Sequence, residues 1–315
     1  MTTFYDSLLL GLSGPWSSFG DPTKRLYWLY CLSSLGLWAV VTLAQRNSPR
    51  PKTPPDKPPR SRYWNRSTQL DLKLLFTNSV IRAIAITPLV VPVTTITTAT
   101  AAALSLLFDT PPPFQLSRSS VAVLYTLALF LVSDASRYGV HRLSHGVPLL
   151  WKFHRVHHSA TSLTPLTLYR MHPVEIVLQE TRRVLAIGLT TGVFLYLFGK
   201  NLNGYDVLGV NLFGFLFNLF GANLRHSNTW LSYGRWVEHL FISPAQHQVH
   251  HSIDPAHHHK NYGSALAIWD WLCGTLHLAP TRSRLQYGVA SDQPGHTTLR
   301  DALLAKRETA APTKG

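Results

Sequence analysis

Long runs of uncharged, mostly apolar residues divide this chain into segments of near-membrane length. The first run, 26–44, holds nineteen uncharged residues. At about 1.5 Å per helical residue, such a run nearly crosses a hydrocarbon core of about 30 Å. Further runs follow at 83–108, 119–140, 184–199 and 207–224. This pattern predicts helices that cross a bilayer.

The runs differ in detail. Pro88 and Pro92 predict a kink within 83–108, because proline removes a helical hydrogen bond. The last two runs are short and are joined by a polar turn. We expect this pair to cross the membrane and to return to the same face. Beyond Arg225 no run is long enough to cross a membrane, and we expect this part to fold outside the bilayer core.

Together these segments predict an all-α integral membrane helical bundle of about four main spans, with a helical cap. We divide the chain into three parts. Residues 1–70 hold the first span and a linker, residues 71–280 form the main membrane-bound domain, and residues 281–315 form a polar C-terminal tail.

Composition supports the membrane class. Hydrophobic residues make up 45% of the chain and charged residues only 14%, against about 25% in soluble domains. The net charge of +14 raises the possibility of nucleic-acid binding. However, seven basic residues and six prolines lie within 46–66. This distribution indicates an extended linker that faces anionic lipid, so we expect no nucleic-acid partner.

The linker also predicts the orientation. The positive-inside rule places 46–66 in the cytoplasm. Counting spans from there brings the chain out again on the cytoplasmic face at His141, His226 and His247. We therefore expect a multi-pass membrane protein whose histidines lie on the cytoplasmic face. A tight hairpin within 72–108 would invert this relation.

Histidines crowd into three blocks of the sequence. His141 and His145 stand four residues apart at the end of the run 119–140, so a helix places them on one face with Asp134 and Tyr138. Asp134 is a candidate acceptor for the second ring N–H of a ligating histidine. The other two blocks, "HRVHH" and "HQVHH", supply His154, His157, His158, His247, His250 and His251. Adjacent histidines in these blocks diverge by about 100° on a helix and can reach two different metals.

Eight clustered imidazoles indicate metal binding. A single HxxxH pair is common by chance, but eight unliganded imidazoles would repel when protonated and would be unsatisfied when buried and neutral. The HEXXH pattern of zinc proteases is absent, and eight nitrogens exceed the needs of one tetrahedral zinc. Two metals held by imidazole suit iron and oxygen chemistry, although imidazole also binds zinc, copper and nickel.

The order of the motifs resembles the fatty acid hydroxylase/sterol desaturase superfamily of integral-membrane di-iron enzymes. The resemblance covers residues 119–280 and rests on these stretches: "SDASRYGVHRLSH", "WKFHRVHHS", "HPVE", "LRHSN", "SPAQHQVHHSID" and "KNYGSALAIWDWLCGT". It implies that the eight histidines of the three blocks, from here on the box histidines, are iron ligands and carry the catalytic centre. It also implies a ninth ligand, His226 of "LRHSN", whose alternative is a hydrogen bond at a helix end. Fatty acid 2-hydroxylases place another histidine four residues before it, where this chain has Ala222.

That departure leaves further candidates. His172 is a possible ligand or supporting group, with Glu175 one turn further on, and the alternative is a loop histidine beside a proline. His257 of the "HHHK" stretch is a possible ligand, against a polar loop. Asp270 follows Trp269 and is a candidate acceptor behind the ligands.

The resemblance implies an enzyme that uses two iron ions and O₂ to hydroxylate or desaturate a C–H bond of a fatty acyl, alkyl or sterol-like lipid. We favour hydroxylation. The sequence shows no dinucleotide, haem or iron–sulfur motif, so we expect an external electron-donor protein or reductant. A metal transporter and a non-catalytic scaffold with a zinc site are the alternatives.

Overall fold

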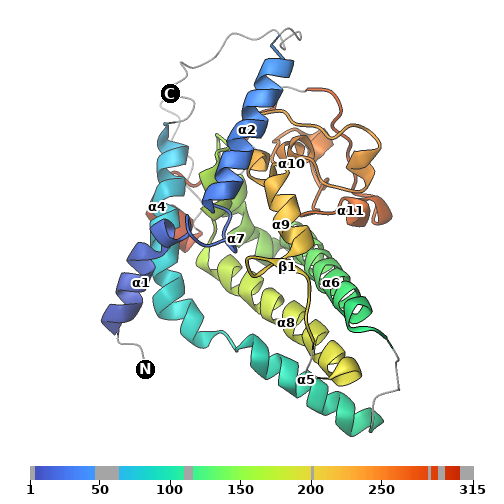
Figure 1. The fold of residues 1–315 in the computed structure, drawn as a ribbon. Helices are drawn as coiled ribbons and strands as arrows, with labels where there is room; N and C mark the ends of the chain where they lie inside the picture. The colour runs from blue at the N-terminus through green and yellow to red at the C-terminus, as the bar shows by residue number, and fades with distance from the viewer. Residues whose placement is uncertain are drawn as a thin grey trace, which may run out of the picture.

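The computed structural model describes residues 4–46, 64–109, 116–199, 202–282, 285–289 and 295–305, and it is mostly helical. This confirms the all-α prediction (Figure 1). The longer α-helices are α1 (Phe4–Ser17), α2 (Trp28–Ala44), α4 (Arg66–Ile81), α5 (Val93–Phe108), α6 (Arg118–Gly146), α7 (Pro148–His158) and α8 (Pro173–Phe198). The shorter ones are α9 (Leu212–Leu219), α10 (Pro244–His250), α11 (Ile268–Leu272) and α12 (Leu299–Leu304). Single turns are η1 (Arg82–Ile86), η2 (Thr87–Leu89), η3 (Pro165–Tyr169), η4 (Ala222–His226), η5 (Val237–His239) and η6 (Pro255–His257). One antiparallel hairpin joins β1 (Asp206–Val207) to β2 (Val210–Asn211).

Within the described residues, three helical segments are long and apolar enough to cross a membrane: 66–108, 118–146 and 173–198. Of their most apolar stretches only 22%, 22% and 39% of residues are buried inside the protein. The remaining apolar side chains therefore have no protein to cover them, as expected of helices that face lipid.

Two sequence-predicted spans take a different form. The run 26–44 becomes α2, which has 17 residues and is a shorter apolar helix. The run 207–224 does not form a long helix, because a hairpin, the eight-residue α9 and a left-handed Gly221 divide it. Three long helices thus replace the expected four or so. Residues 47–63 of the predicted linker lie outside the described residues.

The expected kink in the second span lies between α4 and α5. The α-helix changes to π-helical geometry at η1 and to 3₁₀ geometry at η2, where Pro88 is at the start of the turn. Pro92 then serves as the N-cap of α5. Proline has no backbone N–H, so the chain leaves the α-helical ladder here.

α5 and α8 lie side by side in Figure 1 and pack extensively against each other. Gly188 and Gly192 of α8 make this contact possible. A Cβ atom on Gly188 would come within 2.6 Å of Ile96 Cβ, and one on Gly192 within 2.5 Å of Thr100 Cβ. Small residues four apart allow helix backbones to pack closely in lipid.

The cap that carries the histidines sits on the ends of α4, α6 and α8. Its small apolar core joins Leu70 and Leu74 of α4 to Val156 of α7 and Ala302 of α12. The segment predicted as a polar tail, 281–315, therefore contributes a helix to this core. Residues 306–315 lie outside the described part of the chain.

Candidate metal centre

Three helices and one turn bring the histidines together. His141 and His145 lie in the last turns of α6, and Pro148 opens α7 directly afterwards. Proline is well suited to the first helical position, because no hydrogen bond is lost there. The histidines of "HRVHH" lie on α7 and those of "HQVHH" lie on α10 and its C-cap. Ser243 and Gln246 form a capping box that fixes the start of α10.

The histidines form two groups, in each of which the candidate ligand atoms all lie within 4.8 Å of one another. The five-histidine group contains His141, His145, His154, His158 and His250. The four-histidine group contains His157, His226, His247 and His251. All eight box histidines and His226 are thus gathered in one place. The neighbours His157 and His158 belong to different groups, and so do His250 and His251, as the 100° step of a helix requires.

Hydrogen bonds orient three rings of the five-histidine group. Nδ1 of His141 lies 2.8 Å from the carbonyl oxygen of Tyr262, and Nδ1 of His250 lies 2.8 Å from that of Lys260. Nδ1 of His154 lies 2.7 Å from Oε1 of Glu175. A carbonyl or carboxylate oxygen can only accept, so Nδ1 carries the proton in each ring. The lone pair is therefore on Nε2, the atom that a metal would bind.

Many ring nitrogens at the centre are buried without a hydrogen-bond partner. Among the described residues they are Nε2 of His145, His154, His158 and His250, and Nδ1 of His157 and His247. Such unsatisfied polar atoms are rare in folded proteins and need an explanation. A bound cation would satisfy those that face into the two groups.

The four-histidine group shows the same fit. Nε2 of His226 lies 3.1 Å from Nε2 of His251 and 3.0 Å from Nε2 of His247. A neutral imidazole nitrogen either donates one proton or presents one lone pair. The Nε2 atom of His226 therefore cannot form a hydrogen bond with both neighbours at once. Three lone pairs directed at one cation fit these distances better, and the residues present suit a pair of imidazole-bound metal ions.

Burial keeps these imidazoles neutral. Burial is the largest cause and nearby histidines add to it; together they lower the pKa of His157 to about 4 and that of His250 to about 3. Burial likewise lowers the pKa of His158 and His247 well below the usual value. At neutral pH these four rings are therefore in the deprotonated form that binds metal.

Asp270 supports the centre indirectly. Its carboxylate accepts hydrogen bonds from the backbone N–H groups of Tyr262 and Gly263, at 2.8 and 2.7 Å, and from Thr275 Oγ1 at 2.6 Å. These contacts hold the carbonyl of Tyr262 against His141. Burial raises the pKa of Asp270 to about 6. Tyr138 joins the same cluster, with its hydroxyl 3.1 Å from Thr275 Oγ1.

Asp134 differs from the sequence-based expectation. Its carboxylate accepts hydrogen bonds from the backbone of Ala265 and Leu266, both at 2.9 Å, and from Trp269 Nε1 at 3.0 Å. It holds the segment before α11 against α6 and accepts no hydrogen bond from a histidine in the described structure. The carboxylate that accepts a hydrogen bond from a histidine of the two groups is instead Glu175, from α8.

Two further candidates lie outside both groups. Nε2 of His172 is 2.9 Å from the carbonyl oxygen of Leu303, and its Nδ1 accepts the N–H of Val174 at 3.1 Å, so it caps α8. Both ring nitrogens are therefore engaged. The ring of His257 packs near that of His277, with centroids 5.2 Å apart.

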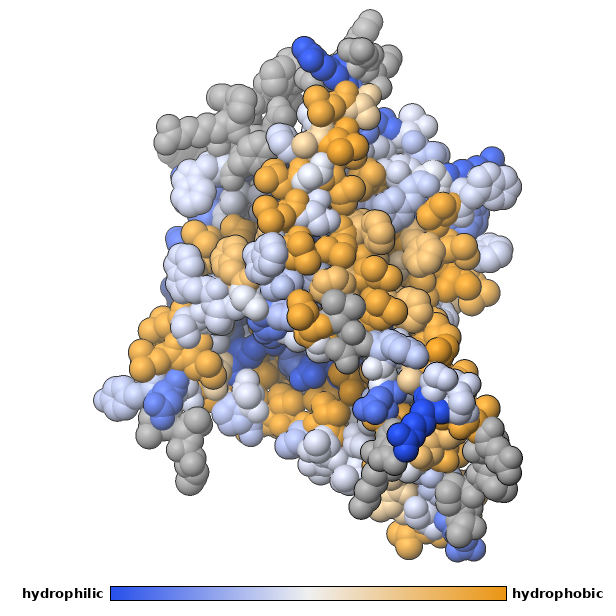
Figure 2. Space-filling model, in the orientation of Figure 1, coloured by the Kyte–Doolittle hydropathy of each residue, from blue (hydrophilic) through white to orange (hydrophobic). Residues whose placement is uncertain are grey.

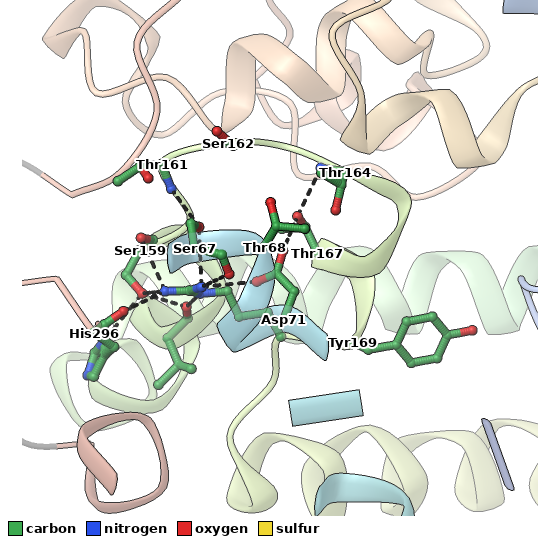
Figure 3. Close-up of polar contacts among 12 residues, drawn as sticks. Ser67, Thr68, Asp71, Ser159, Thr161, Ser162, Thr164, Thr167, Tyr169 and His296 are labelled. Atoms are coloured by element: carbon green, nitrogen blue, oxygen red, sulfur yellow. Dashed lines mark hydrogen bonds and ion pairs between the residues drawn. The ribbon is translucent and has the colours of Figure 1, made fainter. Parts of the chain in front are cut away.

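Sequence reasoning missed Arg170, which fixes the end of α7 (Figure 3). This buried side chain donates to the carbonyl oxygens of Val156, Ser159 and His296 at 2.8, 3.3 and 2.7 Å. It also pairs with Asp71 of α4, Nη1 to Oδ1, at 3.0 Å. Free carbonyls at a helix end need partners, and Arg170 supplies them directly beside His157 and His158. No spacing in the sequence marks it.

A cavity of about 270 Å³ opens onto the five-histidine group. Its walls include His145, Trp151, His158, His250, Ser252 and His259. It gives small molecules a route to the imidazoles from outside the protein.

Known proteins resemble the part of the chain that holds this centre. Residues 126–275 match the model of the fatty acid hydroxylase family. An ornithine lipid hydroxylase of Rhizobium tropici is 31% identical over 159 residues, which are 50% of this chain and 44% of that protein. An alkylglycerol monooxygenase of Danio rerio is 28% identical over 51% of this chain and 32% of its own length. A Delta(7)-sterol 5(6)-desaturase of Gibberella zeae is 28% identical over 49% and 42%.

The chain thus matches less than half the length of each of these relatives. No solved structure matches it. The matched region, residues 126–275, nevertheless contains all nine histidines of the two groups. The resemblance that the motifs indicate is therefore confirmed: residues 126–275 match the fatty acid hydroxylase family.

Proposed function

We propose that this chain is a membrane-bound, O₂-dependent lipid hydroxylase with two iron ions, one in each histidine group. The observation that carries the proposal is the division of nine clustered imidazoles, seven of them buried and two half-buried, into sets of five and four. The relatives named as hydroxylase, monooxygenase and desaturase act in the same chemical class. Because the relative with 31% identity is a hydroxylase, we favour hydroxylation over desaturation.

In this proposal the eight box histidines and His226 hold the metals. Bound iron would supply the oxidation of an unactivated C–H bond by O₂. The protein would hold the metal-binding rings in a fixed orientation and keep water away from the reacting atoms. Glu175 keeps the proton of His154 on Nδ1, and the carbonyls of Tyr262 and Lys260 do the same for His141 and His250. These contacts hold the Nε2 lone pairs toward the metal position before any metal binds.

The substrate in this proposal is a fatty acyl, alkyl or sterol-like lipid that reaches the centre from the bilayer. Its support is the position of the histidines, at the end of the long apolar helix α6 and on the short elements α7, η4 and α10. Electrons would come from an external donor. We further propose that the centre faces the cytoplasm, on the strength of the basic segment 46–66.

The alternatives differ in metal and in location. A transporter would place its ligands near the middle of the spans, whereas these histidines lie at helix ends. A scaffold with one structural zinc needs four ligands, fewer than the nine present. The presence of a second histidine group, which one structural zinc would not need, favours the oxygenase.

Two measurements test the proposal. Elemental analysis of the purified protein should give about two irons per chain, and either His157→Ala or His250→Ala should lower that number and abolish activity. His239→Ala is the matched control, since His239 lies outside both groups and bonds only to the carbonyl of Arg235. One zinc per chain, or full activity in either variant, would refute the di-iron assignment.

The reaction itself is tested by incubating membranes with ¹⁸O₂ and a reductant, followed by lipid mass spectrometry. One labelled oxygen in a lipid product supports hydroxylation. A loss of two hydrogens without label shows desaturation instead. If only water-soluble metabolites change, the lipid-oxygenase proposal is wrong.

A further inference from the structure

Three arginine side chains from distant parts of the chain lie close together around Phe217 and Ser264. Arg25 precedes α2, Arg137 lies on α6 and Arg225 lies in η4. The guanidinium carbons of Arg25 and Arg225 lie 5.4 and 5.2 Å from the centroid of the same ring, Phe217. Arg225 also donates to the carbonyl of Ser264 at 2.6 Å, and Arg137 to its hydroxyl at 3.3 Å. Phe217 and Ser264 thus hold the three cations together.

No carboxylate of the described residues forms an ion pair with them, although the charge of Asp134 acts on Arg225 from a distance. The ion pairs that arginines form there involve Arg82, Arg170 and Arg183. Arg25, Arg137 and Arg225 have no such partner within 4.0 Å. Instead they repel one another, and burial together with this repulsion lowers the pKa of Arg25 well below its usual value. Such an arrangement is unfavourable unless an anion completes it.

Arg25 has a hydrogen-bond donor to spare. Its Nη1 atom is buried and has no hydrogen-bond partner in the described structure. A guanidinium group offers a planar fork that matches the oxygens of a phosphate or a carboxylate. The free donor and the uncompensated charge therefore indicate the same ligand, an oxyanion.

The surroundings indicate that this oxyanion belongs to a lipid. Exposed apolar side chains lie on the elements that carry or adjoin the arginines: Trp28 and Leu32 on α2, Leu131 on α6, Leu216 on α9 and Phe220 at its C-cap. Figure 2 shows the apolar surface that runs over α2 and α9, and a hydrophilic hollow directly below it. α2 packs against α9, and α9 packs against α6, so these faces are continuous. A free anion would gain nothing from them, whereas acyl chains would cover them.

We propose that Arg25, Arg137 and Arg225 bind the anionic headgroup, a phosphate or carboxylate, of a membrane lipid whose chains lie along α2 and α9. This site adjoins the metal centre, because Arg225 directly precedes His226 in η4, but it uses none of the imidazoles. It requires no metal to be bound.

The test is lipid binding to the full chain in detergent, measured by native mass spectrometry with dioleoyl phosphatidic acid and dioleoyl phosphatidylcholine. We expect the protein to prefer phosphatidic acid. Arg25→Gln should weaken phosphatidic acid binding about tenfold or more, since hydrogen bonds to charged groups are strong, and Arg25→Lys should retain part of it. Arg25 is the suitable position because its Nη1 makes no hydrogen bond that the substitution would break. Arg235→Gln, at an exposed arginine outside the cluster, is the matched control.

Several results would overturn the proposal. They are equal binding of the two lipids, unchanged binding by Arg25→Gln, and equal loss in Arg235→Gln. Inorganic phosphate should neither bind comparably nor displace phosphatidic acid at equal concentration, and if it does, the site is one for a free anion. The thermal unfolding midpoint of each variant verifies folding. Metal content, measured in the same samples, tests the proposed function separately, because lipid binding without iron would refute that function and leave this site standing.

Discussion

The carboxylate of Glu175, on α8, accepts a hydrogen bond from Nδ1 of His154, on α7, at 2.7 Å, and both side chains are buried. This contact keeps the His154 proton away from Nε2 and makes the ring a stronger ligand. We expect Glu175→Gln to lower the metal affinity of the five-histidine group about 10- to 100-fold. Dialysis against increasing chelator, followed by elemental analysis, measures the change. Glu180→Gln on the same helix is the control, since Glu180 pairs with Arg82 and Arg183 instead. Equal chelator resistance in Glu175→Gln and the unmodified chain would contradict this role.

The buried histidines predict how stability depends on pH in the metal-free protein. His157 and His250 have folded-state pKa values of about 4 and about 3, below the ordinary value of 6.5. Below pH 6.5 the unfolded chain takes up protons that the folded chain refuses, so the free energy of unfolding falls. We expect a nearly constant thermal midpoint above pH 7.5 and a steady decrease from about pH 6.5 toward pH 4.

The measurement is thermal unfolding of chelator-stripped protein in detergent at a series of pH values. Replacing His157 and His250 together with glutamine should make the decrease shallower, since two of the responsible groups are removed. A midpoint that rises between pH 6.5 and 5 would show that the folded state binds the protons, against this explanation.

Arg170 and Asp71 predict a stability effect at the end of α7. Both side chains are buried, and Arg170 holds three backbone carbonyls beside the metal centre. Removing one partner of a buried ion pair costs about 3–5 kcal/mol. We expect Asp71→Ala to lower the thermal midpoint strongly and to reduce metal content, and Asp71→Asn to be milder because its oxygen still accepts.

The control for that pair is Arg82→Ala, which breaks the more exposed ion pair with Glu180. Pairs of this kind contribute about 0–1 kcal/mol, so its midpoint should change little. If Asp71→Ala and Arg82→Ala have the same small effect, the buried network does not stabilise the cap.

The proposed orientation is tested by cysteine labelling. In a background without Cys31 and Cys273, single cysteines at Ser61 and Thr297 should both react with an impermeant maleimide from the cytoplasmic side. The result is read as labelling in inverted vesicles but not in intact cells. Labelling from opposite sides would place the basic linker and the cap across the membrane from each other.

The membrane class and the identity of the histidines follow from the sequence alone. Hydrophobic runs and helical spacing are local properties, so the run 119–140 predicts much of α6, and "HRVHH" predicts that His157 and His158 point apart. The length of an apolar run predicts the length of the helix less well. The residues 207–224 are apolar, but the turn at 208–209 and the left-handed Gly221 break them into short pieces.

What only the tertiary structure decides is which groups meet across the fold. His154 and Glu175 are 21 residues apart, Asp134 and Ala265 are 131 apart, and Arg170 and Asp71 are 99 apart. No local pattern records such pairings, because a carboxylate satisfies any donor that packing brings to it. Asp134 therefore looked like a partner for a histidine on its own helix and instead holds the chain before α11. The sequence determines which side chains are available as ligands, and packing determines how they divide between two groups and what supports each one.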